Sequence, residues 1–507
     1  MDKKQKAKMM ESLLKSCLFS EYLPSEFTTK QLKKDAFTIT NNAMIPPITF
    51  SMDKFNDYGN RRYISIPDIC AFIQAIHSLD EKDILDQILK LNNSDVHSLS
   101  KILNVKNEIK KFTKGYGFSY VTNELKASTN EDDDFISNLA IKLEKSSACK
   151  CILHLDIANF YNSIYTHNIS TLTQGESWAN QQFQLSKTGQ KPSEEYINLK
   201  NIDSKIADLN LRRTHGILIG PRLSFIIAES LLTQIDNDLE KELLPKDIDF
   251  VRFVDDYDIF IKDEQLINTV KDVFNIVLQK YGLFLNDSKT KIEYFPFYTY
   301  IDYNDFLDKN KGLTINEYAK YAQIEKNNIQ NGALLFFCEN VLSQYIEENN
   351  SDLALSLSFS ILKNVSKATI SSCKNILKYK STNSKANIIR DQLISLTNYF
   401  VKNKYDLESI WALYILLKKY SDCSIDEKIL IDLCEPASVI YLYESLNGFK
   451  NQSIIEKAKN SGWLLNYELF FNNLITSDQF KANLKIDNVD SYMKLKSQGV
   501  HFYIKNT

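Results

Sequence analysis

The sequence predicts an α+β protein, in which an antiparallel sheet with its helices is followed by an all-α C-terminal region. Residues 250–261 read FVRFVDDYDIFI, and two apolar, β-branched and aromatic runs around an acidic pair are typical of a β-hairpin. Glycine (13) and proline (9) are scarce in 507 residues, which favours long helices over turn-rich β architecture. From about residue 310 onward, apolar residues recur at three- and four-residue spacing, which predicts successive helices.

The chain is long enough for two or three domains, each able to bury its own core. We predict an N-terminal helical segment over residues 1–45, an α+β domain over 46–305 and an α-helical, HEAT-like C-terminal domain over 306–507. The net charge of −3 and the pI near 6.2 argue against strong non-specific binding of nucleic acid, although they leave room for a local basic channel.

Cysteine usage and hydropathy both favour a cytoplasmic protein. The eight cysteines are scattered, only Cys149 and Cys151 lie close together, and no CxxC pair or Cys/His cluster has zinc spacing, so we expect reduced thiols. The basic N-terminus has no uninterrupted apolar run, because Glu11 and Lys15 break it. No apolar stretch is long enough to span a bilayer, and we therefore expect no membrane partner.

The first part of the predicted α+β domain is mostly helical and contains one basic strand. Arg61 and Arg62 stand just before an alternating strand that runs from Tyr63 to Ile66, and the planar guanidinium group suits phosphate oxygens. One arginine of this pair is expected to be a plain surface charge. Residues 69–150 are expected to be helical, with the acidic run Glu131–Asp134 as a solvated loop.

Three carboxylates are predicted to lie at strand ends or at a hairpin tip. The apolar strand Ile152–Leu155 delivers Asp156, and Tyr161 is one of the aromatic residues that follow it. The predicted hairpin over residues 250–261 carries Asp255 and Asp256 at its tip. Such carboxylates repel each other unless a cation lies between them, and a divalent metal ion is the usual partner. Taken alone, an Asp–Asp turn is more often a solvated hairpin tip, and an aromatic such as Tyr161 is more often a core residue.

A loop and a helix separate the first carboxylate from the other two. Gly220 and Pro221 mark a loop that enters a helix, for which Ser224 is the expected N-cap. Residues 169–213 have the composition of a surface insertion. After the hairpin, residues 266–281 form an amphipathic pattern, and the segment LFLNDSKTKI places Lys289 on a polar turn, where a lysine is most often only solvated.

The order of these stretches resembles the palm of reverse transcriptases. HLDIANFY with Asp156, THGILIGP with Gly220 and RFVDD with Asp255 are similar to motifs A, B and C of that family, and Lys289 holds the place of the motif D lysine. The resemblance implies reverse-transcriptase-like fingers and palm, and an enzyme of the nucleotidyltransferase class (EC 2.7.7) that polymerises DNA. Ile219 stands where many reverse transcriptases have glutamine, which leaves contacts to a templating base open.

The resemblance also implies roles for single residues. A palm fold would bring the strand ends with Asp156 and Asp255 together as the main ligands of two Mg²⁺ or Mn²⁺ ions about 4 Å apart. Asp256 would be a weaker or more distant ligand, and the backbone carbonyl of Ile157 a further one. Lys289 would lie near the leaving pyrophosphate, and the ring of Tyr161 would exclude a ribose 2′-hydroxyl, which implies dNTP substrates. The residues expected to bind the nucleotide are Arg61, Arg62, Tyr161, Gly220 and Pro221.

Within the family, the chain resembles the abortive-infection (Abi) reverse transcriptases of bacterial phage defence, in particular the AbiK-like group. The resemblance covers residues 45–300 by motif and the remainder by its helical pattern. It implies template-independent DNA synthesis primed from a hydroxyl of the protein itself, DNA covalently attached to the protein, and a homo-oligomer in the bacterial cytoplasm. Tyr22 or Tyr58 is a guess for the priming residue among 27 tyrosines. Two alternatives stay open: a templated RNA-directed DNA polymerase, and a non-catalytic phage-sensing scaffold with a vestigial palm.

Overall fold

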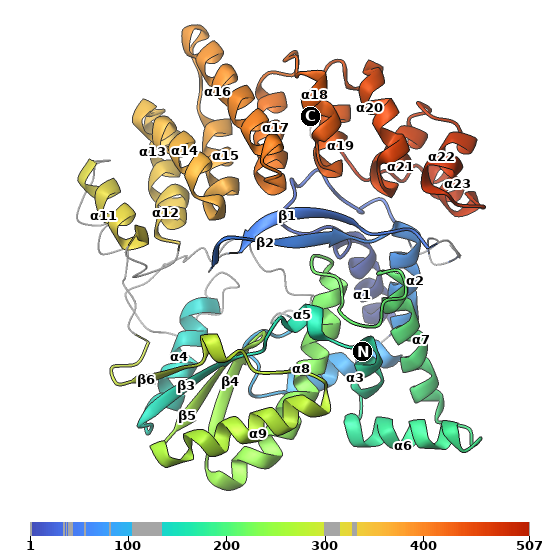
Figure 1. Cartoon of the computed structure of the whole chain (residues 1–507), viewed down its shortest axis with the longest axis vertical. Coiled ribbons are helices and arrows are strands. Elements are labelled where there is room, and N and C mark those ends of the chain that lie inside the picture. Colours follow the sequence, from blue (N-terminus) through green and yellow to red (C-terminus); the bar gives the residue numbers. More distant parts are fainter. Residues whose placement is uncertain are drawn as a thin grey trace.

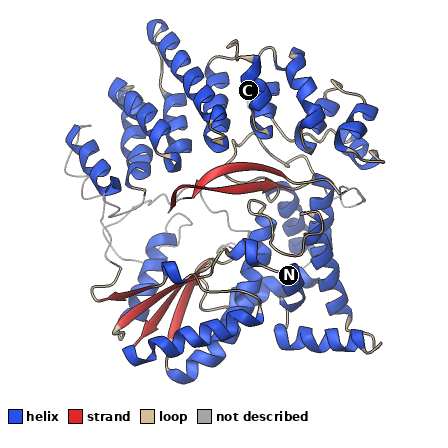
Figure 2. Cartoon of the chain, viewed as in Figure 1, coloured by secondary structure: helices blue, strands red, loops and turns tan. Residues whose placement is uncertain are grey.

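The computed structural model describes residues 3–33, 36, 38, 44–54, 57–80, 83–103, 134–298, 315–326 and 332–505. Helices dominate these ranges, and the strands form two separate sheets (Figure 2). A curved row of helices from the C-terminal part lies along one side, and the larger sheet with its helices lies opposite (Figure 1). A two-stranded hairpin lies between these two parts.

The hairpin consists of β1 (Ile48–Lys54) and β2 (Asp57–Ile66), paired antiparallel with Ile48 opposite Ile66. Alternation puts Phe50, Met52, Ile64 and Ile66 on one buried face. We call this element the β1–β2 hairpin. A two-stranded ribbon is marginal by itself in water, so its stability depends on the elements packed against its faces and edges.

Among the described residues, the N-terminal part of the chain contains the helices α1 (Lys3–Ser16), α2 (Ile69–Asp80), α3 (Ile84–Ser94) and α4 (Asp134–Ser146). α1 packs on α2, and α3 packs on the later helix α8. The amphipathic pattern of α2 explains its placement, because its large apolar side chains, including Phe72 and Ile76, are fully buried.

The larger sheet has the strand order β4–β5–β3–β6 within the described residues. Its strands are β3 (Cys151–Asp156), β4 (Asp249–Phe253), β5 (Asp256–Ile261) and β6 (Lys291–Tyr294), and all neighbouring pairs are antiparallel. One face joins the main core through residues such as Phe250 and Ile259, whereas Ile152, Val251 and Phe260 form a small cluster on the other face. We call it the central sheet.

Helices α8 (Arg222–Leu243) and α9 (Ile267–Lys280) contact each other beside the central sheet (Figure 1). α8 is buried almost continuously from Leu223 to Asp236, which makes it the central helix of this half of the molecule. Short α5 (Phe160–Ser163) follows β3, and α6 (Glu176–Lys187) and α7 (Glu194–Asp208) fill the connector before α8.

The C-terminal part is helical throughout its described ranges. Its elements follow one another in a curved row (Figure 1). Their bounds are α11 (Ile315–Lys326), α12 (Ala333–Phe336), a π-helix (Phe337–Leu342), α13 (Ser343–Asn349), α14 (Asp352–Asn364), α15 (Thr369–Lys378), α16 (Asn383–Lys402), α17 (Asp406–Lys419), α18 (Glu427–Asp432), α19 (Glu435–Glu444), α20 (Gln452–Lys457), α21 (Trp463–Phe471), α22 (Ser477–Leu484) and α23 (Asp490–Ser497).

The two ends of the chain are joined through backbone and side-chain contacts. The amide of Thr28 donates to the carbonyl of Phe502 at 3.0 Å, and the amide of Ile504 donates to the carbonyl of Glu26 at 2.9 Å. The carboxylate of Glu26, which is 2 % exposed, accepts from the hydroxyl of Tyr414 at 2.6 Å. The N-terminal segment and the C-terminal helices therefore share one core.

The predicted fold class is confirmed: an antiparallel sheet with helices precedes a largely helical C-terminal region. Several local predictions were wrong. Arg61 and Arg62 lie inside β2, because the strand begins at Asp57 and not at Tyr63. Ser224, the predicted N-cap, lies inside α8, and Pro221 is the N-cap residue. The connector 169–213 contains α6, which is mostly exposed, and α7, which packs on α2. The acidic run at residues 131–133 lies outside the described residues. The domain boundaries and the HEAT-like character remain predictions.

Replacing Phe502 by alanine is expected to destabilise the whole molecule. This ring is fully buried between Trp463 and Tyr467, with centroids 5.2 and 5.0 Å away. We expect a loss of about 3–5 kcal/mol in the free energy of unfolding, because the substitution leaves a large cavity. Phe295→Ala, at a ring that is 80 % exposed, is the matched control and should change stability by less than about 0.5 kcal/mol. Urea unfolding followed by circular dichroism measures both, and equal effects would contradict the shared core.

Candidate functional site

The carboxylates of Asp156, Asp255 and Asp256 meet at one end of the central sheet. Asp156 ends β3 and is paired in register with Asp256, the first residue of β5. Asp255 belongs to the turn between β4 and β5, and its backbone carbonyl accepts from the amide of Ile157 at 3.3 Å. The strand order β4–β5–β3 places these residues together, since β5 and β3 are direct neighbours. We call this group the carboxylate cluster.

Negative charge is crowded in the carboxylate cluster. Desolvation raises the pKa of Asp255, and the charge of Asp156 adds to the rise, although Lys289 and Arg62 oppose it. The pKa of Asp256 is raised to about 7 by desolvation, followed by the charges of Asp255 and Asp156. A cation bound here would relieve this repulsion, which is the electrostatic condition of a metal site.

Asp156 is held by two residues from the segment after α9. The ammonium group of Lys289 lies 2.6 Å from Oδ2 of Asp156, and the side-chain amide of Asn286 donates to Oδ1 at 2.8 Å. The backbone amide of Asn286 also donates to the carbonyl of Asp156 at 2.8 Å. The pKa of Lys289 is raised, because the hydrogen bond and charge of Asp156 outweigh desolvation. The lysine therefore remains a cation at the edge of the cluster.

The turn that carries Asp255 has a strained backbone. Val254, a β-branched residue, has φ of +53°, a conformation that such residues rarely adopt. Both backbone groups of Val254 are fixed: its amide donates to Oγ of Ser100 at 2.9 Å, and its carbonyl accepts from Nη1 of Arg252 at 3.0 Å. Ser100 and Arg252 are fully buried. These two hydrogen bonds hold the turn and thereby fix the direction of Asp255.

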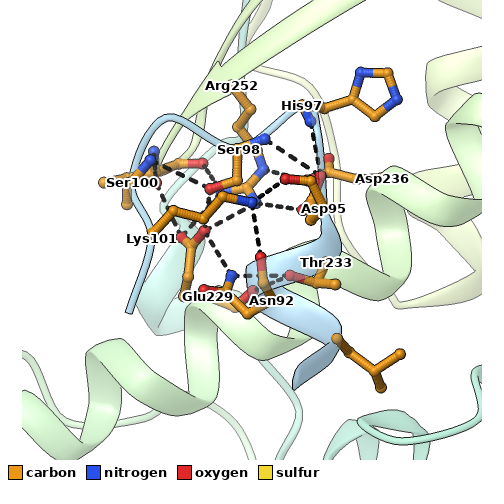
Figure 3. Close-up of polar contacts among 12 residues, drawn as sticks. Asn92, Asp95, His97, Ser98, Ser100, Lys101, Glu229, Thr233, Asp236 and Arg252 are labelled. Atoms are coloured by element: carbon orange, nitrogen blue, oxygen red, sulfur yellow. Dashed lines mark hydrogen bonds and ion pairs between the residues drawn. The ribbon is translucent and has the colours of Figure 1, made fainter. Parts of the chain in front are cut away.

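A buried polar network supports the two residues that hold the turn (Figure 3). Arg252 makes a bidentate pair with Glu229 of α8, at 3.0 Å to each oxygen, and donates from Nε to Asp236 at 2.7 Å. Ser98 and Ser100 donate to the two oxygens of Glu229 at 2.6 and 3.1 Å. Breaking a buried ion pair of this kind leaves an uncompensated charge, which costs about 3–5 kcal/mol. We call it the Arg252 network.

Asp95 and Asp236 complete the Arg252 network, and the loop after α3 is bonded to the same part of β4. Oδ1 of Asp95 accepts from the amides of His97 and Ser98, and its other oxygen lies 3.5 Å from Arg252. Burial raises the pKa of Asp236 well above its usual range despite the attraction of Arg252. Residues 97–99 bond to β4 through both backbone groups of Arg252. The loop after α3 thus extends the central sheet beside β4.

The β1–β2 hairpin touches the loop that precedes α8. The amide of Ser65 donates to the carbonyl of Ile219 at 2.7 Å. Gly220 has φ of +126°, and a Cβ there would lie 2.7 Å from Cγ2 of Ile64 and 2.8 Å from the carbonyl oxygen of Ser65. Glycine is therefore required for this close approach. Pro221 follows as the N-cap residue of α8.

The two arginines of β2 lie on opposite faces. Arg62 shares the face of Ile64, and its charge acts on Asp255. Arg61, which the sequence also assigned to nucleotide binding, is instead paired with Glu408 of α17, at 2.6 Å. Its side chain is only 17 % exposed, so the expected plain surface charge is not found at this position.

Tyr161 lies beside the carboxylate cluster, as a residue that packs against the core. Desolvation raises the pKa of its phenol, and the charge of Asp255 is the next largest cause. Its backbone carbonyl accepts from the amide of Ile217 at 2.9 Å, which connects the segment after β3 to the loop before α8. Tyr22 packs against the core next to α17, where its carbonyl accepts from Trp411. Tyr58 is in β2, but its side chain is outside the described residues.

Sequence reasoning missed Ser100, Glu229, Arg252 and Asn286. Two signals were present: a glutamate within the apolar helix segment SFIIAESLLTQI, and an arginine inside the strand FVRF. A charged residue in a run that is otherwise buried needs a partner, and here each supplies the partner of the other. Ser100 gives no such signal, because a serine in a loop is usual.

Comparison with known proteins identifies the type of domain. Residues 88–314 match the profile of the family described as reverse transcriptase (RNA-dependent DNA polymerase), and this range contains the carboxylate cluster, the Arg252 network and Lys289. The chain therefore contains a reverse transcriptase domain, which belongs to the nucleotidyltransferase class of polymerases. No curated protein matches this chain.

Two solved structures are similar over most of this chain. A telomerase from Candida albicans, in complex with a TWJ fragment of telomeric RNA, is 16 % identical, with 81 % of this chain and 67 % of that chain covered and a TM-score of 0.32. An apo telomerase from Candida tropicalis is 13 % identical, with 90 % and 69 % covered and a TM-score of 0.34. Scores of this size support no inference about this chain.

The donor chemistry of the carboxylate cluster fits divalent metal ions, which reverse transcriptase domains generally use. Carboxylate oxygens are the ligands that Mg²⁺ prefers, and the charges of neighbouring carboxylates add to the desolvation that raises the pKa of Asp255 and Asp256. In the described ranges, no three His, Cys, Asp or Glu side chains are already arranged closely enough to hold an ion. One oxygen of Asp156 is instead occupied by Lys289.

Among the helices of the described ranges, none combines the length and apolar character that a bilayer crossing requires.

Ser100→Ala is expected to loosen the turn that carries Asp255. The substitution removes the acceptor of the Val254 amide and a donor to Glu229, so we expect a loss of about 1–3 kcal/mol in the free energy of unfolding. We also expect faster amide exchange at residues 253–256. Ser94→Ala is the control, because the Ser94 hydroxyl is exposed and bonds only within its own helix end. Hydrogen exchange read by mass spectrometry checks both variants, and unchanged exchange at residues 253–256 would contradict the role of the Ser100 hydrogen bond in holding the turn.

Asp256→Asn is expected to stabilise the metal-free protein at neutral pH. Because the pKa of the Asp256 carboxyl is higher in the folded than in the unfolded state, the protein loses stability as the pH rises from the unfolded pKa through about 7. The variant should therefore match the wild type near pH 4 and gain about 1–3 °C in Tm above pH 7. Asp272→Asn, an exposed aspartate on α9, is the control. Differential scanning calorimetry in EDTA measures the effect, and a gain that does not grow with pH would refute the electrostatic cause.

Proposed function

We propose that this chain is a DNA polymerase of the reverse transcriptase type, which transfers deoxynucleotides from dNTPs by two-metal nucleotidyl transfer. The observation that carries the proposal is the register of β3 with β5, which pairs Asp156 with Asp256 and leaves Asp255 at the adjoining turn. Two carboxylates at strand ends and a third on the adjoining turn, within a reverse transcriptase domain, are a donor set suited to such transfer.

In this proposal, Asp156, Asp255 and Asp256 hold two Mg²⁺ or Mn²⁺ ions, and the backbone carbonyl of Ile157 is a further ligand. Such ions would lower the pKa of the attacking hydroxyl and neutralise charge on the leaving pyrophosphate. The chain's own contribution is to hold the ligands in place. The hydrogen bonds of Val254 to Arg252 and Ser100 support that role for the neighbouring Asp255. Lys289, which remains a cation, is suited to neutralise the leaving pyrophosphate.

The nucleotide would lie between the carboxylate cluster and the β1–β2 hairpin. Arg62 is the arginine whose charge acts on Asp255, and we assign to it the contact with the triphosphate. Tyr161 would exclude a 2′-hydroxyl, and the backbone at Gly220 and Pro221 would approach the sugar and base. Arg61 has no part in this assignment, because it is paired with Glu408.

We further propose that the polymerase acts in bacterial defence against phage by abortive infection, and that it is protein-primed and template-independent. The support is the resemblance of HLDIANFYNSIYTH, THGILIG and RFVDD to the Abi reverse transcriptases, followed by a helical C-terminal region. The net charge of −3 agrees with an enzyme that does not grip a long template–primer duplex. Attachment of the DNA product to a tyrosine and assembly into a homo-oligomer belong to the same proposal.

Incorporation of labelled dNTPs without added nucleic acid tests this function. Purified protein with Mg²⁺ or Mn²⁺ is expected to retain label on a denaturing gel until protease releases it. Asp255→Asn should reduce incorporation by at least about a thousandfold, while the exposed Asp272→Asn should leave it unchanged.

Two other results would replace the proposal. Label that appears only when template–primer is added would identify a templated RNA-directed polymerase and overturn the protein-primed assignment. No label under either condition would overturn catalysis, and a phage-defence assay with Asp255→Asn that keeps full protection would then favour a scaffold.

A further inference from the structure

The β1–β2 hairpin is attached to the C-terminal helices along the outer edge of β1. The amide of Ser51 donates to Oδ2 of Asp406 at 2.7 Å, and its hydroxyl donates to the carbonyl of Lys404 at 2.9 Å. Asp406 begins α17, and Lys404 lies just before it. An unpaired strand edge normally needs a cover, and here the start of α17 supplies it. The hairpin is thus held by the C-terminal helices, although it lies far from them in the sequence.

The side chain of Arg61 strengthens this attachment. It donates to both oxygens of Glu408, at 3.1 and 2.6 Å, and to the hydroxyl of Ser51 at 3.1 Å. Its guanidinium group also lies over the ring of Tyr405, 4.7 Å from the centroid. Glu408 is 2 % exposed, so the pair is bidentate, stacked and shielded from water. This geometry is far more restrictive than that of a surface ion pair.

The outer edge of β2 is attached to the other half of the molecule. Ser65 donates its amide to Ile219, and Gly220 leaves no room for a side chain against Ile64 and the Ser65 carbonyl. Arg62 projects from the same strand, and its charge acts on Asp255. A displacement of the hairpin would therefore move the loop before α8 and the arginine beside the carboxylate cluster together.

We propose that the C-terminal helical region positions the β1–β2 hairpin for nucleotide binding, with Arg61 and Glu408 as positioning residues that act through the loop at Gly220 and through Arg62. This inference rests on the proposed polymerase function, and it gives the C-terminal region a direct part in building the nucleotide site. Arg61 itself does not touch the nucleotide in this scheme. The predicted consequence is a specific loss of affinity for dNTP when the attachment is broken.

Glu408→Gln is the first test, because it removes the charge and keeps the shape. We expect the KM for dNTP to rise at least about fivefold while kcat at saturating dNTP changes less than about twofold. Amide exchange should accelerate in residues 48–66 and stay unchanged in β3 and β5. Glu444→Gln is the matched control: Glu444 is also buried and ion-paired, but it bonds to Tyr503 and to Lys418, which lies at the opposite end of α17 from Asp406 and Glu408. It should lower the Tm and leave the KM unchanged.

The double variant Arg61→Met/Glu408→Leu separates positioning from direct contact with the nucleotide. Replacing both partners of a buried ion pair by apolar residues is often tolerated, so the hairpin should stay attached and the KM should return to within about twofold of the wild type. A double variant as impaired as Arg61→Met alone would mean that Arg61 contacts the nucleotide, which overturns the inference.

Three outcomes are distinguishable. Unchanged KM and unchanged exchange in Glu408→Gln would overturn the positioning role, as would an equal rise of KM in Glu444→Gln. A wild type that incorporates no dNTP under any condition would count against the proposed function. In that case the exchange of residues 48–66 in Glu408→Gln still decides whether the C-terminal region holds the hairpin.

Discussion

The bidentate pair between Arg252 and Glu229 is the interaction on which the rest of the reverse transcriptase domain depends. It joins β4 to the central helix α8, and through Ser98 and Ser100 it binds the loop after α3. All of these groups are removed from water, so none can be lost without leaving a neighbour unsatisfied. The same network fixes the strained turn at Val254. The chain thus uses its most deeply buried charges to hold the backbone beside the carboxylate cluster.

The carboxylate cluster, unlike the Arg252 network, destabilises the folded protein. Desolvation, and after it the charges of neighbouring carboxylates, raises the pKa of Asp255 and Asp256, which disfavours the folded state at neutral pH unless a cation is present. Lys289 and Asn286 bond directly to Asp156, and the charge of Lys289 opposes only part of the rise in the pKa of Asp255 and Asp256. A site that is unfavourable by itself must be held by favourable interactions elsewhere, and the Arg252 network lies directly behind it. Stability and function are therefore divided between two adjacent groups of residues.

Sequence patterns predicted the elements of this fold well where the pattern is local. The strand before Asp156, the hairpin around Asp255 and the successive C-terminal helices follow from alternation and from three- and four-residue spacing. The patterns failed where a residue's role depends on a distant partner. Arg61 looked like its neighbour Arg62, and only Glu408, which is 347 residues away in sequence, distinguishes them. Ser100 is an ordinary loop serine until the amide of Val254 lies against it.

The pairing of residues 26–28 with residues 502–504 bears on how the chain acquires its structure during synthesis. Phe27 lies against Tyr503, with ring centroids 5.1 Å apart, and both are buried. The N-terminal segment cannot complete this core until the last of these residues has left the ribosome. Contacts of such sequence separation form late and slowly. The β1–β2 hairpin would likewise stay without its cover until α17, to which Ser51 and Arg61 are bonded, has been synthesised.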